Sequence, residues 1–492
     1  MPVSDESNRG GTAAGSDGGN GISADAARER VPNRELLIYA LGSIGGSFSW
    51  SVNMLTNPIF NMELHVSLVW LGFVLAANRV LDAITDLLIG YWSDHLHTRW
   101  GRRRPLIFVG GLGVGLLFAL MWLFPSNLSQ TGYLIWYGVI SVFYYLGTTL
   151  FGTGYWALGI ELTSGYNERT RVSAWRSYAG AFAGLTTPWF LWFIHNKRFF
   201  DNPIEGVHWL GVIVGTVMVA TTLPVALFCK ERFAKIEARK KTHISFGRAM
   251  TVMFRNKEWM RMTGVGLLLM ATLVLFEQFS MYVNFFYVFG GDKEKATFVG
   301  GVVGNVGTVC GLLAIPLVQA LSTRLGKHVA VRLCLAWMMI GTAMKWWCYT
   351  PEHPWLQLII PFFYSIGIAA FYTITPSMTA DIVDVDELIT GERREAMFSA
   401  VGNLIGKIAN AGATALTGFV MAATGFVVEL EGKQSPETFT KMRLMYSIIP
   451  ACVLLTALAL VWGYSLTESR VTQIQAELRT RRAGAAGGGP AA

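Results

Sequence analysis

The chain alternates between long apolar segments and short polar connections, and the alternation repeats twelve times. Each apolar segment is about 20 residues or longer, which lets a helix cross a hydrocarbon core of ~30 Å. The estimated spans are 35–60, 67–92, 105–124, 132–160, 173–195, 207–229, 259–289, 296–321, 328–350, 354–379, 395–424 and 443–467. The pattern predicts an all-α membrane protein with twelve transmembrane helices, six on either side of a linker.

The composition supports a membrane environment. Of the 492 residues, 52% are hydrophobic and 15% are charged, whereas soluble domains contain about 25% charged residues. The net charge of +8 raises the question of nucleic-acid binding. The basic residues cluster in short connections rather than on a soluble face, so we expect no nucleic-acid partner. The five cysteines show no metal-ligand spacing.

The distribution of lysine and arginine predicts the orientation. Alternate connections are rich in these residues, and the positive-inside rule places such connections in the cytoplasm. Besides the linker, the residues are Arg99, Arg102, Arg103, Arg104, Arg169, Arg171, Arg324, Lys327, Arg393 and Arg394. We therefore expect a multi-pass protein of the cell (inner) membrane with both termini in the cytoplasm.

Five regions follow from these assignments. They are a cytoplasmic tail 1–33, an N-terminal six-helix bundle 34–229, a basic cytoplasmic linker 230–258, a C-terminal six-helix bundle 259–467 and a cytoplasmic tail 468–492. The first tail and the Ala/Gly-rich end after Arg482 contain no apolar run that could form a core, so we expect both to be disordered.

No nucleotide-binding element is apparent. Gly111, Gly113 and Gly115 form a Gly-x-Gly-x-Gly pattern inside the third span. Because no strand precedes them, the pattern favours close helix packing over a dinucleotide-binding loop. The chain encodes no nucleotide-binding domain, which excludes coupling to ATP hydrolysis within it.

Two carboxylates interrupt the second span. Asp82 and Asp86 lie one helical turn apart, so they project from the same face. Ionisable groups at membrane depth are costly and typically serve ion or proton pathways. Because two close carboxylates repel, one of them should hold a proton or both should share a cation. The alternative is a structural ion pair of Arg79 with Asp82 near the membrane surface.

Further polar residues fall within other spans. They are Arg176, Glu277, Lys345, Asn403 and Lys407. Lys407 has apolar neighbours and needs a carboxylate partner, for which Asp82 and Asp86 of the other half are the natural candidates. For Arg176 the alternative is a phosphate anchor at the membrane surface, and for Lys345 it is a position near a helix end. Tyr155 and Trp156 are our candidates for stacking on a sugar ring.

Mixed charges at the cytoplasmic side suggest a gate. Acidic and basic residues alternate between the tenth and eleventh spans, and they could pair with arginines of the other half when the inward side closes. The proposed gate residues are Asp94, Arg102, Arg103, Arg169, Asp384, Arg393 and Glu395. The alternative is a solvated loop.

These motifs resemble a known family. The pattern Arg79-x-x-Asp82-Ala83-x-x-Asp86-x-x-x-Gly90, continuing to Asp94 and to Arg99-Trp100-Gly101-Arg102-Arg103-Arg104-Pro105, is similar to the signature of the glycoside–pentoside–hexuronide:cation symporters of the major facilitator superfamily. A second motif, from Asp381-x-x-Asp384 through Thr390-Gly391-Glu392-Arg393-Arg394-Glu395 to Lys407, resembles the same family. The resemblance covers nearly all of residues 35–467 and implies two six-helix bundles that alternate access to a central site.

The resemblance also implies roles for individual residues. It places Asp82, Asp86 and Thr149 at the coupling-cation site, and Arg176, Trp156 and Lys407 at sugar-contacting or coupling positions. In the melibiose-permease branch, aspartates stand where this sequence has Ser47 and Gly152. The loss of a carboxylate weakens a site for a hard cation such as Na⁺. Proton coupling is therefore favoured over Na⁺ at Asp82 and Asp86, and a galactoside substrate is not expected.

The leading hypothesis is a symporter that couples uptake of a sugar or glycoside to H⁺ or Na⁺, working as a monomer in the lipid bilayer with no cofactor besides the ion. The expected substrate-binding residues are Tyr155, Trp156, Arg176, Glu277, Asn403 and Lys407. The alternatives are a lysolipid or amphiphile transporter of the same fold, and a non-transporting membrane sensor. The sequence shows no nucleophile–base set or metal cluster that would support an enzyme.

Overall fold

The computed structural model describes residues 31–96, 98–163, 166–231, 253–254, 256–391 and 394–487. The predicted tail 1–33 and linker 230–258 lie mostly outside these residues. The described residues are helical apart from turns, short connections and one isolated bridge between Thr98 and Gly101.

The N-terminal bundle contains six helical segments within the described residues. The first and fifth are each divided into three pieces. In chain order the segments are α2 (Asn33–Phe48) with α3 (Ser51–Thr56) and η1 (Asn57–Glu63), α4 (Leu68–His95), α5 (Arg104–Trp122), α6 (Gln130–Glu161), α7 (Tyr166–Thr186) with η2 (Thr187–Trp189) and α8 (Phe190–His195), and α9 (Pro203–Phe228).

The C-terminal bundle also contains six segments within the part of the chain that the structure describes, and a helix follows it. They are α11 (Lys257–Met270) with η3 (Ala271–Phe276), α12 (Gln278–Tyr282) and η4 (Val283–Val288), α13 (Lys293–Leu325), α14 (Lys327–Cys348), η5 (Pro354–Ile359) with α15 (Ile360–Thr390), α16 (Glu395–Ala423) with η6 (Val428–Lys433), and α17 (Pro436–Tyr446) with α18 (Ile448–Trp462), before α19 (Glu468–Gly487).

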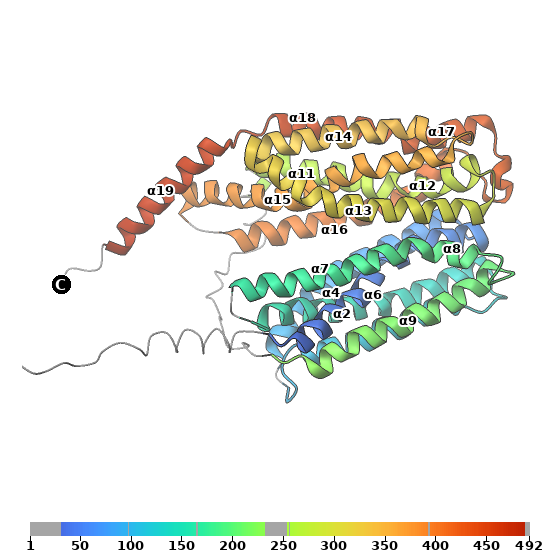
Figure 1. Cartoon of the computed structure of the whole chain (residues 1–492), viewed down its shortest axis with the longest axis horizontal. Coiled ribbons are helices and arrows are strands. Elements are labelled where there is room, and N and C mark those ends of the chain that lie inside the picture. Colours follow the sequence, from blue (N-terminus) through green and yellow to red (C-terminus); the bar gives the residue numbers. More distant parts are fainter. Residues whose placement is uncertain are drawn as a thin grey trace, which may run out of the picture.

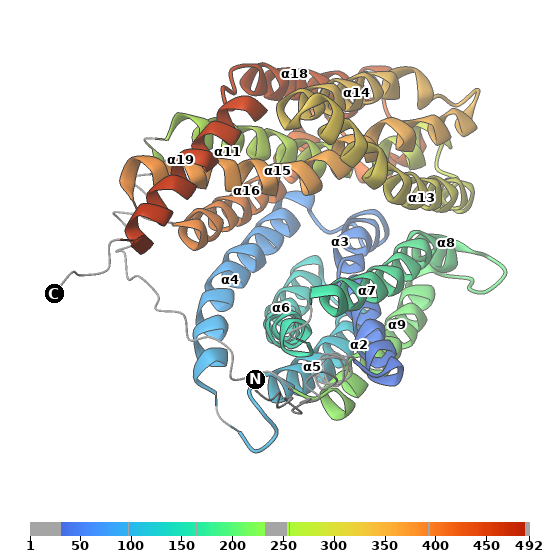
Figure 2. The ribbon, with the colours of Figure 1, turned by 60° about the vertical axis from the view of Figure 1, so that its left-hand side comes forward.

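The two bundles lie side by side, with α2–α9 in one and α11–α18 in the other (Figure 1). Helices α4 and α16 line much of the contact between them (Figure 2). The start of α2 and the end of α18 lie at the same end of the molecule, which we call the terminal end (Figure 1). At the opposite, far end the last residue of η1, Glu63, contacts Lys293 at the start of α13.

Ten helices within the described residues are long and apolar enough to cross a membrane. The first and fifth predicted spans are helical as well but are interrupted. In the first, α2 ends at Phe48 and a turn precedes α3. In the fifth, α7 carries Arg169, Arg171 and Arg176, and Pro188 lies in the 3₁₀ turn that follows. All twelve predicted spans therefore correspond to helical segments.

Two boundaries differ from the predictions. Helix α15 continues to Thr390 rather than stopping at 379, and Gly391 ends it in the left-handed conformation at φ +75°, which glycine adopts without strain. The acidic residues of the proposed gate segment therefore lie on helix, not in a loop. Helix α19 likewise continues through Gly487. The disorder predicted after Arg482 is therefore wrong for residues 483–487, where the alanines favour helix.

Glycines allow the helices of the N-terminal bundle to pack closely. A Cβ atom at Gly110 would overlap the backbone nitrogen of Phe151 on α6 and lie 2.9 Å from the carbonyl oxygen of Gly147. Gly115 meets the backbone of Gly215 on α9 in the same way. Gly113 faces open space, with its nearest neighbour 4.0 Å away. The predicted packing role is therefore confirmed for Gly111, whose Cβ would meet Thr222 of α9, and for Gly115, but not for Gly113.

Polar contacts join the two bundles at the far end. Glu63 Oε1 accepts hydrogen bonds from Lys293 Nζ at 2.8 Å and from His195 Nε2 at 3.3 Å. Tyr282 Oη donates to Asn61 Oδ1 at 2.7 Å. Burial opposes ionisation of Glu63, but its hydrogen bonds from His195 and Lys293 and the charge of Lys293 outweigh burial and lower its pKa to about 2. The far end is therefore held together by a carboxylate that stays charged.

Gly110→Ala should lower the stability of the protein by about 1–3 kcal/mol, because the added methyl group would push α5 away from α6. Gly113→Ala is the matched control, since its methyl group meets open space and alanine gains up to about 1 kcal/mol of helix propensity over glycine. Thermal unfolding in detergent measures both. Equal melting temperatures for the two variants would contradict this packing.

Glu63→Gln should lower the melting temperature at neutral pH. A carboxylate with a depressed pKa stabilises the folded state above its ordinary pKa and loses this effect as the pH falls through the folded-state value. The difference from the wild type should therefore shrink as the pH falls below about 4.5 toward about 2. Glu437→Gln is the control, because Glu437 forms an exposed pair with Lys441 and such pairs contribute little. A difference that did not change with pH would contradict the assignment.

Candidate functional site

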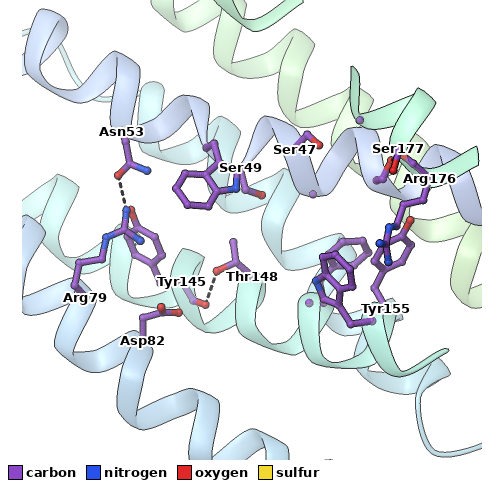
Figure 3. Close-up of a pocket in the computed structure, with 17 residues that line it drawn as sticks. Ser47, Ser49, Asn53, Arg79, Asp82, Tyr145, Thr148, Tyr155, Arg176 and Ser177 are labelled. Atoms are coloured by element: carbon purple, nitrogen blue, oxygen red, sulfur yellow. Dashed lines mark hydrogen bonds between the residues drawn. The ribbon is translucent and has the colours of Figure 1, made fainter. Parts of the chain in front are cut away.

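A cavity of about 490 Å³ lies in the N-terminal bundle between α2, α4, α6 and α7 (Figure 3). The polar and aromatic side chains that line it include Ser43, Ser47, Asn53, Arg79, Asp82, Tyr145, Thr148, Trp156 and Arg176. Figure 3 shows Arg79 and Asp82 at one end of the cavity and Arg176 at the other. The volume falls within the range of about 300–1,000 Å³ that is typical of small-molecule sites.

The two carboxylates of α4 share one ammonium from the other bundle. Lys407 Nζ, on α16, donates to Asp82 Oδ2 at 3.0 Å and also to Asp86 Oδ2. Asp82 Oδ1 accepts a further hydrogen bond from Thr149 Oγ1 on α6 at 3.1 Å. The pairing expected from the sequence is therefore present. Two negative charges face one positive charge, so the group can take up one more cation.

The alternative ion pair of Arg79 with Asp82 does not form in the described part of the chain. Arg79 Nη2 donates instead to Asn53 Oδ1 at 2.7 Å, and its guanidinium lies 5.2 Å from the centre of the Tyr145 ring. Among the described residues, no group of three or more His, Cys, Asp and Glu side chains could hold a metal ion. Asp82 contacts Thr149 and shares Lys407 with Asp86, and the coupling-cation role of these three residues stays a prediction.

The two aromatic candidates have different environments. Trp156 is 58% exposed, and the guanidinium of Arg176 lies 4.0 Å from the centre of its ring. Tyr155 borders the cavity, but it is 3% exposed, stacks on Tyr39 at 4.6 Å and donates its hydroxyl to the Tyr39 carbonyl oxygen at 2.9 Å. Trp156 is therefore the more accessible of the two rings at the cavity, and Tyr155 holds α6 against α2.

Glu277 lies at a second cavity of about 380 Å³ between the bundles, which shares Trp50 and Asn53 with the first. Its Oε2 accepts from Lys345 Nζ at 2.7 Å. Lys345 is 2% exposed, lies in the last turn of α14 and packs between Tyr364 and Tyr446. Glu277 thus neutralises a buried ammonium.

Two of the expected substrate-binding residues line neither cavity, and two residues that do were not expected. Asn403 is exposed on α16, and Lys407 of the same helix contacts Asp82 instead. Sequence reasoning missed Asn53 and Trp50, which lie beside the break between α2 and α3. Nothing in the local sequence predicts that break. Arg79 stands out in the sequence as a charged residue in an apolar span, and it lines the cavity, but its contact with Asn53 could not be predicted.

The proposed gate residues that the structure describes contact partners from the same half of the chain. Glu161 Oε1 accepts from Arg102 at 3.2 Å and from Arg103 at 3.3 Å. Arg169 donates to the carbonyl oxygen of Thr163, and Asp384 accepts from Gln475 of α19.

Two further acidic residues near the end of α15 also pair within the C-terminal bundle. Asp381 pairs with Lys327 at 2.7 Å and Asp386 with Arg394 at 2.9 Å. Arg393 and the side chains of Asp94 and Glu395 lie outside the described residues. Closure by pairs between the bundles stays a prediction for another conformation.

Comparison with known proteins now identifies the family. Residues 38–468 match the family described as "MFS/sugar transport protein". The chain belongs to this family. It has the all-α major facilitator fold of two six-helix bundles, and it is a multi-pass membrane transport protein rather than an enzyme.

Several known proteins are similar to this chain over most of its length. A glucuronide carrier protein homolog of Escherichia coli is 22% identical, over 91% of this chain and 96% of its own. A lactose permease of Lactobacillus delbrueckii subsp. bulgaricus is 22% identical, over 90% of this chain and 72% of its own. Among solved structures, a bacterial homolog of the human lysosomal transporter Spinster, inward-facing and occupied, shares the fold with a TM-score of 0.62 and 16% identity, over 93% of this chain and 99% of its own.

Lys407→Gln should destabilise the transporter, because Asp82 and Asp86 would then repel each other without a shared ammonium. Adding Asp86→Asn to Lys407→Gln should recover part of the loss. In a double-mutant cycle on thermal unfolding, we expect a coupling energy of about 0.5–3 kcal/mol. Strictly additive effects of the two substitutions would contradict the pairing.

Proposed function

We propose that this protein is a secondary active symporter that couples the uptake of a sugar or glycoside to H⁺ by alternating access. The observation that carries the proposal is the placement of Lys407, which joins the two bundles through Asp82 and Asp86 beside a cavity of sugar size. Two relatives carry carbohydrates in their names, a glucuronide carrier protein homolog and a lactose permease, and these names support a carbohydrate as the substrate.

The shared ammonium supplies a coupling mechanism. Lys407 holds α16 against α4 only while Asp82 and Asp86 carry negative charge. A cation that binds to either carboxylate reduces the attraction, which weakens the contact between the bundles. Cation binding and the relative movement of the bundles are therefore linked, and linkage of this kind is reciprocal.

A proton suits this group better than Na⁺. Na⁺ is a hard cation that needs several oxygen ligands, and beside the carboxylates α6 offers Thr149 while Gly152 adds no side-chain oxygen. A proton needs a single carboxylate oxygen, and the repulsion between Asp82 and Asp86 favours its uptake. Na⁺ at Asp82 and Asp86 is the alternative ion.

The orientation follows from the charges. The arginine-rich connections of Arg102–Arg104 and Arg169 lie at the terminal end, so the positive-inside rule supports a cytoplasmic terminal end in an inner membrane. The contacts of Glu63 and Tyr282 hold the far, external end together. A closed external end is typical of an inward-facing state. In the outward-facing state, Arg102, Arg103 and Arg169 would pair with the acidic residues at the end of α15. The symporter would act as a monomer in the bilayer.

Asp82→Asn and Asp86→Asn should each abolish concentrative uptake in proteoliposomes, because the amide cannot take up the coupling proton. Asp201→Asn is the control, since Asp201 is an exposed loop residue at the far end. Uptake under an imposed pH gradient, compared with a Na⁺ gradient, identifies the ion. Uptake that stays fully driven by the gradient in both α4 variants would refute the proposal.

A further inference from the structure

The ammonium of Lys293 at the far end contacts two carboxylates, one from each bundle. Glu63 of η1, in the N-terminal bundle, lies 2.8 Å away, and Glu431 of η6, in the C-terminal bundle, lies 3.3 Å away. Lys407 differs in this respect, because both of its carboxylates belong to α4. If the bundles separate at the far end, Lys293 loses Glu63 but moves together with Glu431.

The backbone of Glu431 is held in an unfavourable conformation. Its φ is +45° and its ψ is −120°, a region that glycine adopts readily and that costs free energy for a residue with a side chain. The buried amide of Gln434 holds this turn by donating to the carbonyl oxygens of Val427 and Glu431. A backbone outlier that its surroundings maintain is evidence for a function at that residue. Here the residue carries the carboxylate that reaches Lys293.

Close backbone packing ties Glu431 to the start of α13. A Cβ atom at Gly432 would lie 2.5 Å from the carbonyl oxygen of Gly290, in the turn that leads to Lys293 at the start of α13. Segment η6 and the start of α13 therefore form one packed unit within the C-terminal bundle. When the bundles move relative to each other, this unit keeps Glu431 within reach of Lys293.

The charges at Lys293 give the two carboxylates different effects. Glu63 is the more firmly bound, because His195 also contacts it at 3.3 Å and its side chain is 15% exposed, against 52% for Glu431. Two carboxylates that share one ammonium repel each other. Opening of the far end removes Glu63, ends this repulsion and leaves Lys293 to Glu431 alone. Glu431 therefore stabilises the open state more than the closed state.

We propose that Lys293 exchanges partners during transport, so that Glu63 binds it while the far end is closed and Glu431 holds it when this end opens. Glu431 is then a positioning residue that favours opening toward the outside. The inference rests on the proposed alternating access and adds an external latch to it. Its distinctive consequence is that two carboxylates on the same ammonium shift the conformational equilibrium in opposite directions.

The rate of thiol labelling from outside measures the equilibrium without any substrate. Met54→Cys places a thiol in the cavity between the bundles, and a membrane-impermeant maleimide added to intact cells reaches it when the far end opens. Cys310 and Cys452, the native cysteines that are not buried, are replaced by serine. The rate is proportional to the open fraction, so it remains measurable when that fraction is small.

The two carboxylates should give opposite results. Glu63→Gln should speed labelling by about fivefold or more, because hydrogen bonds to a charged group are lost in the closed state. Glu431→Gln should slow it by about two- to fivefold, the range expected for an exposed ion pair. Glu429→Gln is the matched control, since Glu429 is an exposed carboxylate of the same segment, and it should leave the rate unchanged.

Glu431→Gly separates charge from backbone strain. Glycine removes the carboxylate and also relaxes the positive φ. We expect it to slow labelling as much as Glu431→Gln does, while raising the melting temperature above that of the Gln variant. Unequal labelling rates for the two variants would show that strain, rather than the carboxylate, governs opening.

Two further results would overturn the inference. If Glu431→Gln speeds labelling as Glu63→Gln does, both carboxylates only hold the far end closed and Lys293 does not exchange partners. If Glu431→Gln leaves the rate unchanged, Glu431 has no part in opening. In both cases the proposed symport stands, provided that labelling occurs. If Met54→Cys is not labelled in any variant and no ion gradient drives carbohydrate uptake, the proposed function itself is refuted.

Discussion

The arrangement of this transporter depends on one ion-pair group, in which Lys407 of α16 is held by Asp82 and Asp86 of α4. It forms where the bundles meet, beside the cavity, and at membrane depth. A charged side chain there is stable only if its partner is also present. The ammonium and the carboxylates therefore constrain each other's position, and through them the two halves of the chain constrain each other.

The packing of the N-terminal bundle positions Asp82 so that it can bind Lys407. Close packing at Gly110 and Gly115 fixes α5 against α6 and α9, so that Thr149 of α6 reaches Asp82. The break between α2 and α3 places Asn53 beside Arg79 and directs the arginine away from Asp82. Asp82 is thereby left to Lys407. A rigid N-terminal bundle with one carboxylate pair at its surface is suited to sensing the position of the other bundle.

The sequence allowed prediction of those site residues that carry a charge inside an apolar span, because charged residues are rare at membrane depth. Apolar spans exclude charge, so Asp82, Asp86 and Lys407 stand out against their neighbours, and opposite charges at membrane depth must meet. The partners of Arg102 and Asp386 could not be predicted in this way. Each has several residues of opposite charge nearby in the sequence. The choice among these partners depends on the tertiary fold, which buries Asp386 together with Arg394. The break after Phe48 and the burial of Tyr155 depend on helix packing, which no local pattern reveals.

The charge of the site and the movement of the bundles are parts of the same electrostatic balance. Without a coupling ion, Asp82 and Asp86 carry two negative charges and are opposed by Lys407 together with the two guanidinium groups of the cavity. In the symport that we propose, uptake of a proton removes one negative charge, so the attraction that holds α16 to α4 falls while the positive potential in the cavity rises. The proposed protonation step therefore leaves Lys407 weakly held, which is the condition under which the two bundles can move relative to each other.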